Sequence, residues 1–271
     1  MKRSLLLLLM LLVSGGNTLA EQVYSFGIVP QQSASKLAQL WGPILQRVNQ
    51  QSGIKLQFAT APDIPTFENR LAAGEYDFAY MNPYHYTIFQ QAPGYQALAK
   101  ARDKRIEGII VVHNGPQGTQ TLQQLNNRTL AFPSPAAFAA SILTRSHLAG
   151  LNINFTPNYV SSHDSVYRAV AKGLYPAGGG IMRTFNNLSP EIREQLRVIW
   201  TSNGYTPHAI ASHPRTQPQV VKKLQQALIQ LEQSTEGKRL LYGIKLKGFE
   251  AASNADWDDV RTLHIEQLSD L

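Results

Sequence analysis

The 271-residue sequence contains no cysteine and, after its first 20 residues, no apolar run of membrane-spanning length. Without cysteine there are no disulfides, no thiolate metal sites and no lipid-anchored amino terminus. Charged residues make up only 16% of the chain, and the basic clusters are scattered without interleaved aromatics, so we expect no nucleic-acid partner. The phosphate-binding Walker loop, the Gly-x-Ser-x-Gly elbow and the His-Glu-x-x-His zinc helix are also missing. We therefore expect no enzyme activity, no cofactor and no metal.

The first 20 residues have the parts of a secretory signal peptide. Lys2-Arg3 precedes an apolar stretch at residues 5–13, and small residues lead up to Ala20. A membrane span needs about 20 apolar residues, so this stretch is too short to be an anchor. We expect residues 1–20 to be removed, which lowers the formal charge from +7 to +5. An exported chain that is not embedded in a membrane and has no lipid tether indicates the periplasm of a Gram-negative cell.

Strand and helix patterns alternate along the rest of the chain. Apolar residues at helical spacing predict a helix over residues 34–51, and further helices are expected over 136–149, 163–172 and after residue 217. Short apolar runs predict strands at 23–29, 55–61, 78–81, 107–113, 128–132, 155–160, 177–182 and 196–201. This alternation predicts an α/β fold, with parallel or mixed sheets covered by helices. We expect two lobes joined by two strands, the first from residues 21–112 and 202–271 and the second from residues 113–201.

Four of the predicted strands are followed by residues that favour a helix start. Asn82-Pro83 is the clearest example, because Asn is a preferred N-cap and Pro fits the first helical position. Ser33, Ser134-Pro135 and Ser161-Ser162 stand in the same relation to three other strands. Helix N-termini attract anions, and the carboxyl ends of strands face the ligand crevice of an open α/β sheet. Each of these helix starts alone could belong to an ordinary loop between a strand and a helix, but the four together predict an anion-binding cleft.

Several segments resemble one family of transport proteins. They are Phe26-Gly27-Ile28-Val29-Pro30, Phe67-Glu68 with Gly74-Glu75-Tyr76-Asp77, Tyr80-Met81-Asn82-Pro83, Ser162-His163-Asp164 and Ala177-Gly178-Gly179-Gly180. In this order they resemble the phosphate-, phosphite- and phosphonate-binding proteins of ABC transporters. The resemblance implies a type 2 periplasmic binding protein, whose two α/β lobes close on a small oxyanion and deliver it to a permease. Helix geometry separately argues against a catalytic triad at Ser162-His163-Asp164, since consecutive helical residues point about 100° apart and triad side chains must converge.

The resemblance further implies which residues bind the ligand. Tyr86 and His163 match family positions that hydrogen-bond the phosphoryl oxygens from the two lobes. The turn of Ala136, Ala137 and Phe138 matches the oxyanion cradle and would offer backbone N–H groups, but it lacks the Ser and Thr hydroxyls of phosphonate binders. His163 stands at an expected helix start, so we expect its neutral form.

Two other departures concern the ligand itself. Ile64 stands where some phosphonate binders have tyrosine, and residues 177–184 contain no acidic residue to hold an aminoalkyl group. We therefore expect an acid that is smaller or more apolar than aminoethylphosphonate.

The remaining candidates have alternatives that stay open. Asn82 could bind the ligand or only cap a helix, and Tyr84 could equally be a core aromatic. Ser33 could add a hydroxyl donor, while Thr184 and Arg183 could line the cleft or face water. The other histidines are expected to be structural or at the surface.

Two other roles are compatible with the same fold. The loaded protein could dock on a membrane histidine kinase as a sensor, or it could bind an unrelated organic acid. We expect a monomer in each case.

Overall fold

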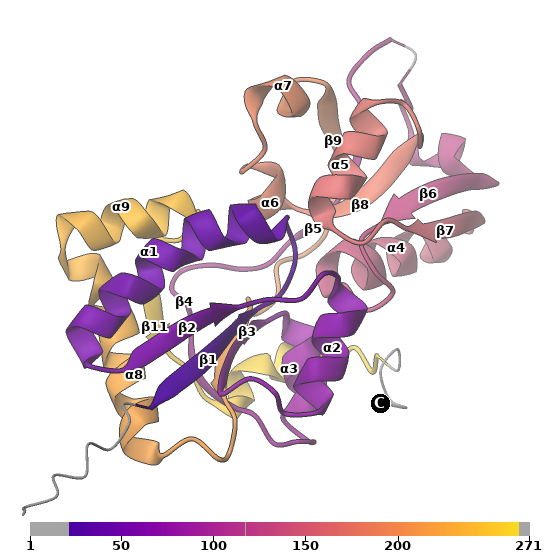
Figure 1. Cartoon of the computed structure of the whole chain (residues 1–271). Helices are drawn as coiled ribbons and strands as arrows, with labels where there is room; N and C mark the ends of the chain where they lie inside the picture. Colours follow the sequence, from indigo (N-terminus) through magenta and orange to yellow (C-terminus); the bar gives the residue numbers. More distant parts are fainter. Residues whose placement is uncertain (1–21, 117, 266–271) are drawn as a thin grey trace, which may run out of the picture.

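Two sheets form the framework of the protein, whose computed structural model describes residues 22–116 and 118–265 (Figure 1). The first sheet has the order β11-β4-β10-β3-β1-β2 and consists of β1 (Val23–Ile28), β2 (Lys55–Ala59), β3 (Phe78–Met81), β4 (Gln96–Ala101), β10 (Ala209–Ser212) and β11 (Phe249–Ala251). The second has the order β7-β6-β8-β5-β9 and consists of β5 (Gly108–His113), β6 (Arg128–Phe132), β7 (Phe155–Tyr159), β8 (Ala177–Ile181) and β9 (Leu196–Thr201). Both sheets mix parallel and antiparallel pairs, so the predicted α/β class with mixed sheets is confirmed.

Helices cover both sheets. Those of the first lobe are α1 (Ala34–Ser52), α2 (Ile64–Ala72), α3 (Pro83–Phe89), α8 (Pro218–Gln230), η3 (Leu231–Gln233), α9 (Thr235–Gly243), η4 (Asn254–Trp257) and α10 (Asp258–Arg261). Those of the second lobe are η1 (Leu122–Leu125), the π-helix η2 (Phe138–Leu143), α4 (Thr144–Gly150), α5 (His163–Ala171), α6 (Met182–Phe185) and α7 (Pro190–Arg193). Figure 1 shows α1 and α9 on one side of the first sheet and α2 and α3 on the other.

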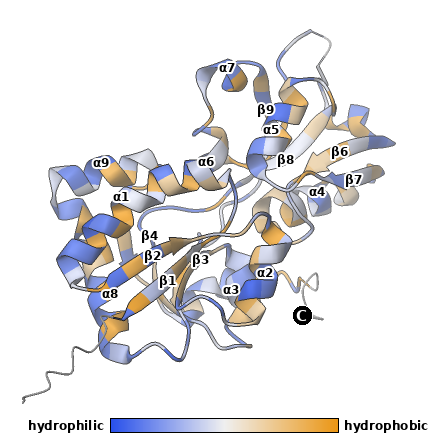
Figure 2. Cartoon of the chain, viewed as in Figure 1, coloured by the Kyte–Doolittle hydropathy of each residue, from blue (hydrophilic) through white to orange (hydrophobic). Residues whose placement is uncertain are grey.

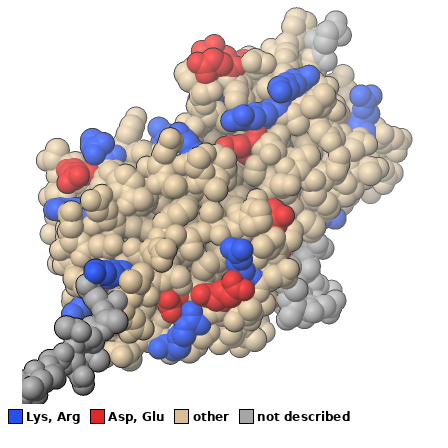
Figure 3. Space-filling model, in the orientation of Figure 1, with Lys and Arg blue, Asp and Glu red and all other residues tan. Residues whose placement is uncertain are grey.

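Strand β5 shows why the second sheet is covered on both faces. Successive side chains of a strand point to opposite faces. Ile109 and Val111 accordingly join one apolar cluster with α5, while Ile110 and Val112 join another with α4. The central strands of the first sheet are likewise apolar (Figure 2), and basic and acidic side chains are interspersed on the face drawn in Figure 3.

Two chain segments, residues 102–107 and 202–208, connect the sheets. They pair through one antiparallel bridge, in which the N–H of Ile106 donates to the carbonyl oxygen of Tyr205 at 2.8 Å and the N–H of Tyr205 donates back at 3.0 Å. β5 lies beyond this bridge and pairs with β8 and β9. The expected lobe boundary after residue 112 is therefore corrected, because β5 belongs to the second sheet and the change of lobe lies before Gly108.

The expected signal peptide, residues 1–20, lies outside the described residues. Among the helices of the described part, none combines the length and apolar character that a membrane crossing needs.

Gly179 in β8 is expected to tolerate no side chain. A Cβ there would lie 1.9 Å from the carbonyl oxygen of Ala140 and 2.7 Å from the Phe132 ring. Overpacking of this kind costs about 1–3 kcal/mol, so Gly179→Ala should lower the free energy of unfolding in urea by at least that range. Gly150→Ala, where a Cβ meets no atom within 4 Å, is the matched control and should stay within about 0.5 kcal/mol of wild type. Equal stability of the two variants would contradict the close packing of η2 on β8.

Candidate functional site

A narrow cavity lies between the two lobes. Its walls come from both lobes and from the connecting segment, namely from Val29, Gln31, Ile64, Asn82, Ile106, Ala137, Phe138, Ala139, Ala140, His163 and Ile181. It spans about 250 Å³ of space between protein atoms, and its enclosed part has room for roughly one water molecule. A larger solute therefore requires the lobes to move slightly apart.

Three of the four predicted helix starts are confirmed. Asn82 caps α3, because its side-chain oxygen accepts from the N–H of His85 at 2.7 Å. Ser162 caps α5 through the N–H of Ser165 at 3.1 Å, and Ser33 caps α1 through a longer bond of 3.4 Å. Asn82 also reaches across to the second lobe, where its amide nitrogen donates to the carbonyl oxygen of Ala136 at 3.2 Å. The cap thus also fixes how the lobes meet.

The fourth predicted helix start is wrong. Ser134 does not cap a helix. Its hydroxyl is buried and has no hydrogen-bond partner within the described residues, and the chain makes one more turn before η2 begins at Phe138. Ala137 takes the N-cap position with no side-chain bond. The reason lies in tertiary packing, since Gly108 and Gly179 leave room for the carbonyl groups of η2 to lie directly on β5 and β8.

Free donors stand at this helix start. η2 continues directly into α4, and the first N–H groups of a helix have no partner within it. Among the described residues, the N–H groups of Phe138, Ala139 and Ala140 have no acceptor, and these three residues line the cavity. Ala137 lines it as well, although its N–H donates to the carbonyl oxygen of Ser134 at 3.4 Å. Ala136 does not line the cavity, and its carbonyl oxygen accepts a hydrogen bond from the amide nitrogen of Asn82.

His163 adds a side chain without a partner on the same wall. The residue is only 2% exposed, and its ring Nδ1 is buried with no hydrogen-bond partner in the described part of the protein. Burial, followed by the positive charge of Arg183, lowers the pKa of His163 to about 3. The imidazole is therefore neutral, as expected, but burial is the main cause. In the neutral ring, one nitrogen carries a hydrogen and can donate a hydrogen bond, and the other nitrogen can accept one.

Gln31 and His208 belong to the same region, and sequence reasoning missed both. The amide nitrogen of Gln31 lies 2.8 Å from Nε2 of buried His208, and its amide oxygen accepts from the guanidinium of Arg183 in the second lobe. His208 stacks on Tyr80 with ring centroids 4.9 Å apart. Burial lowers the pKa of His208, and the charge of Arg183 adds to the effect. His208 is thus neutral, and its Nε2 can accept a hydrogen bond from the amide N–H of Gln31.

Four residues predicted to contact the ligand lie elsewhere. Tyr86 donates to Oδ1 of Asn254 at 3.2 Å and packs on Trp257, with ring centroids 4.5 Å apart. Tyr84 donates to the carbonyl oxygen of Ile265 at 3.1 Å. α3 packs against α10, so both tyrosines face the interior of the first lobe.

The other two residues that lie away from this cavity are Thr184 and Ser33. Thr184 is buried inside the second lobe with its hydroxyl 2.8 Å from that of Tyr167. Ser33 is exposed and lines a separate open groove beside Lys36 and Arg168. The cavity therefore receives His163, Asn82, Ala137 and Phe138 from the predicted set, and the structure gives no support for ligand contacts by Tyr86, Tyr84, Thr184 or Ser33.

Comparison with known families decides the broad assignment. Residues 26–257 match the family described as the periplasmic substrate-binding protein of phosphonate ABC transporters. The chain belongs to this family. The resemblance based on sequence motifs is thereby confirmed, and the family is one of substrate-binding transport proteins.

Similar proteins agree with this assignment. The phosphate-import protein PhnD of Mycolicibacterium smegmatis is 22% identical over 232 residues, which are 75% of this chain and 70% of the relative. A binding protein component of an ABC phosphonate transporter from Pseudomonas aeruginosa has a TM-score of 0.83 at 18% identity, covering 91% of this chain and 87% of its own. PhnD1 from Prochlorococcus marinus, in complex with methylphosphonate, has a TM-score of 0.81 at 16% identity, covering 92% and 99%. These structures establish the two-lobe periplasmic binding fold.

Neutral His163 makes stability depend on pH. The pKa of His163 is lowered from 6.5 to about 3 in the folded protein. Between these values the unfolded chain binds a proton and the folded one does not, so the free energy of unfolding should fall as the pH drops below 6.5. The loss is at most about 1.4 kcal/mol per pH unit for this group.

Thermal unfolding between pH 7.5 and 5 measures this effect. The melting temperature of His163→Gln should decrease less steeply with falling pH than that of wild type. His264→Gln, at an exposed histidine, is the control and should follow wild type. Identical slopes for wild type and His163→Gln would show that His163 is not held neutral by burial.

Proposed function

We propose that the protein captures a small oxyanion of the phosphate, phosphite or phosphonate class between its lobes and delivers it to an ABC permease. The observation that carries this proposal is the wall formed by the start of η2 and by His163, where backbone and ring donors without partners face one cavity. An anion removed from water needs several such donors, because an unpaired buried charge is very costly.

The donors are sufficient in number for useful affinity. The N–H groups of Phe138, Ala139 and Ala140 and one ring N–H of His163 are free for an incoming anion. Hydrogen bonds to a charged group contribute about 1.5–3 kcal/mol each. After the cost of ordering the ligand and the lobes, a few of them support binding near −8 kcal/mol, which corresponds to roughly micromolar affinity.

Closure of the lobes would trap the anion. The lobes are held together by the bond from Asn82 to Ala136, by the N–H of His163 on the carbonyl oxygen of Gln31 at 3.1 Å, and by the bond from Arg183 to Gln31. The two connecting segments share one antiparallel bridge and two side-chain bonds, from Arg105 to Thr206 at 3.2 Å and to the carbonyl oxygen of Gly204 at 3.1 Å. We expect a hinge motion to take place at these two segments, because they alone run between the sheets. The ligand enters when these bonds open and replaces water on the donors.

The family, and what its relatives import or bind, support transport of a phosphorus oxyanion. One relative is a phosphate-import protein and another was crystallised with methylphosphonate. We further propose that this chain works in the periplasm as a monomer, hands its ligand to a permease and performs no catalysis. Docking on a sensor kinase and binding of an unrelated organic acid remain the alternative hypotheses.

Calorimetry on the chain without residues 1–20 tests the ligand class. Titration with phosphate, phosphite and methylphosphonate should give at least one ligand that binds at about 1:1 in the micromolar range. Acetate and lactate serve as controls and should not bind. Binding of a carboxylate alone would favour the organic-acid alternative, and absence of binding by all five would overturn the proposal while leaving the fold unaffected.

Two variants test where the ligand lies. His163→Ala removes a donor from the cavity wall and should weaken binding of the best ligand about 10- to 100-fold. Tyr86→Phe removes a hydroxyl that bonds only within the first lobe, to Asn254 and Ala97, and should change affinity less than 3-fold. If Tyr86→Phe weakened binding as strongly as His163→Ala, the ligand would lie against α3 and not against η2.

A further inference from the structure

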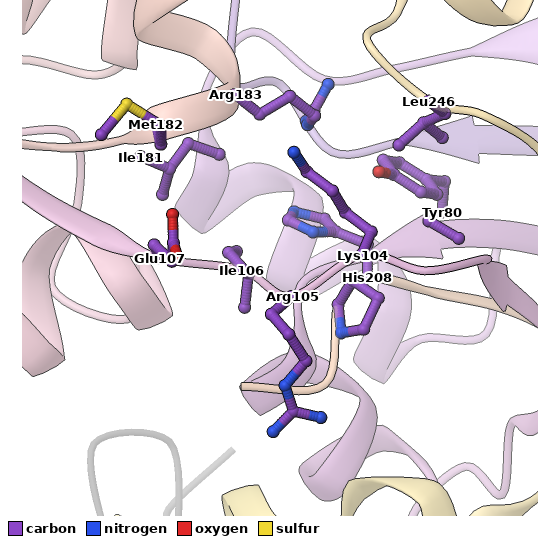
Figure 4. A pocket seen from close by; sticks show the side chains of 12 residues that line it. Tyr80, Lys104, Arg105, Ile106, Glu107, Ile181, Met182, Arg183, His208 and Leu246 are labelled. Carbon is purple, nitrogen blue, oxygen red and sulfur yellow. The ribbon is translucent and has the colours of Figure 1, made fainter. Parts of the chain in front are cut away.

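A second cavity lies beside the first, at the connection between the lobes (Figure 4). It spans about 370 Å³ of space between protein atoms, and its enclosed part has room for only one or two water molecules, so a ligand group enters it only when the lobes move apart. Ile106 and Ile181 line both cavities. Its remaining walls come from both connecting segments, from the start of α6, from β3 and β4, and from the loop between α9 and β11. The polar and charged residues among them are Tyr80, Lys104, Arg105, Glu107, Arg183 and His208.

Arg183 brings a positive charge to this cavity that no acidic residue neutralises. It is half-buried, and its guanidinium bonds to the amide oxygen of Gln31 and lies 6.0 Å above the centroid of the Tyr80 ring. In the described part of the chain, no Asp or Glu forms an ion pair with Arg183. An amide oxygen carries only a partial charge, so the guanidinium retains the capacity to bind an anion.

The other charged groups of the lining leave the cavity positive. Lys104, which Figure 4 shows directed into the same space as Arg183, also forms no ion pair within the described residues. Arg105 is neutralised, because it pairs with Asp259 at 2.7 Å. Glu107 is the one acidic residue of the lining. The lining therefore holds two cations without an ion pair among the described residues, half-buried Arg183 and exposed Lys104, and one carboxylate.

Gln31 connects the two cavities. It lines the first cavity, and its amide oxygen accepts from Arg183, which lines the second. A solute whose one end lies on the free N–H groups of η2 can thus extend toward Arg183 and replace the amide oxygen of Gln31 as its partner. The guanidinium matches a carboxylate especially well, because the two form parallel hydrogen bonds.

From this arrangement we infer that the physiological ligand is a phosphonate that carries a carboxylate as a second anionic group. Its tetrahedral end binds at the start of η2, and its carboxylate binds Arg183 in the second cavity. The inference rests on the proposed function, and it adds Arg183 as the residue that selects among phosphonates. An aminoalkyl phosphonate is disfavoured, because its ammonium group would enter a space with an excess of positive charge.

Calorimetry with three probes that share the phosphonate group tests the inference. Wild type should bind phosphonoacetate at least 10-fold more tightly than methylphosphonate. It should bind 2-aminoethylphosphonate no more tightly than methylphosphonate. Arg183→Gln should weaken phosphonoacetate binding about 10- to 100-fold and change methylphosphonate binding less than 3-fold. Arg193→Gln is the matched control, since this arginine of the same lobe lies over the Phe185 ring at 4.6 Å and lines neither cavity. It should bind all three probes as wild type does.

Each contrary result has its own meaning. Equal wild-type affinity for methylphosphonate and phosphonoacetate would overturn the inference that the ligand carries a second anionic group, and would leave the proposed function intact. This comparison uses only wild type, so it does not depend on whether Arg183→Gln folds. Tightest binding of 2-aminoethylphosphonate, lost in Glu107→Gln, would identify Glu107 as an ammonium site and also overturn the inference. An equal loss of both phosphonates in Arg183→Gln would place Arg183 on the phosphonate group itself. If none of the three probes bound, and phosphate and phosphite did not bind either, the proposed function itself would be overturned, and this inference with it.

Discussion

Gln31 makes the contacts on which the geometry of the cleft depends. Its carbonyl oxygen accepts from the N–H of His163, its amide oxygen accepts from Arg183, and its amide nitrogen bonds to His208. The first two partners belong to the second lobe and the third belongs to the returning segment of the first. Gln31 and its backbone therefore hold the starts of α5 and α6 against the first lobe, while the bond from Asn82 to Ala136 holds the turn before η2 there. Movement of the lobes exchanges these bonds for bonds to water or to a ligand.

Burial imposes a second constraint on this region. Two histidines and an arginine lie close together, and three positive charges in so little water would repel one another strongly. The pKa of each histidine is lowered by burial and by the charge of Arg183, so both imidazoles are neutral and the guanidinium alone is charged. Of these three side chains, only Arg183 then brings a fixed positive charge to the cleft, beside several neutral donors. Such a site favours an anion without depending on protonation of a histidine at physiological pH.

The parts of the structure that depend on local chemistry were predictable from the sequence. Asn82 and Ser162 cap helices because a short polar side chain there finds a backbone N–H three residues later. Ser134-Pro135 has the same local signal but fails, because glycines in two distant strands allow η2 to pack in another way. β4 was missed since its sequence, Gln-Ala-Leu-Ala-Lys-Ala, has no strand preference of its own; pairing with β10 and β11 on its two sides imposes the extended form.

The candidate site was predictable only in part for the same reason. The resemblance led to His163 and to the turn before α4, whose places follow from the ends of strands. It also suggested Tyr86, whose direction depends on how α3 packs against α10, and a single sequence carries no signal of that packing. Gln31 and His208 are 177 residues apart, so neither could be recognised as the partner of the other.

The alanines at the start of η2 and the arginine of α6 are best understood together. A cradle of Ser and Thr hydroxyls would hold an oxyanion through many neutral donors, and this chain has Ala136, Ala137 and Ala139 there instead. Hydroxyls lost from a buried anion site must be offset, because each missing hydrogen bond to a charge is worth about 1.5–3 kcal/mol. A guanidinium without an acidic partner can supply that free energy through a charge-assisted bond, and in the inferred complex Arg183 would do so where it now bonds the amide oxygen of Gln31. Affinity then depends less on the tetrahedral group, which every ligand of the class shares, and more on what the ligand presents to Arg183.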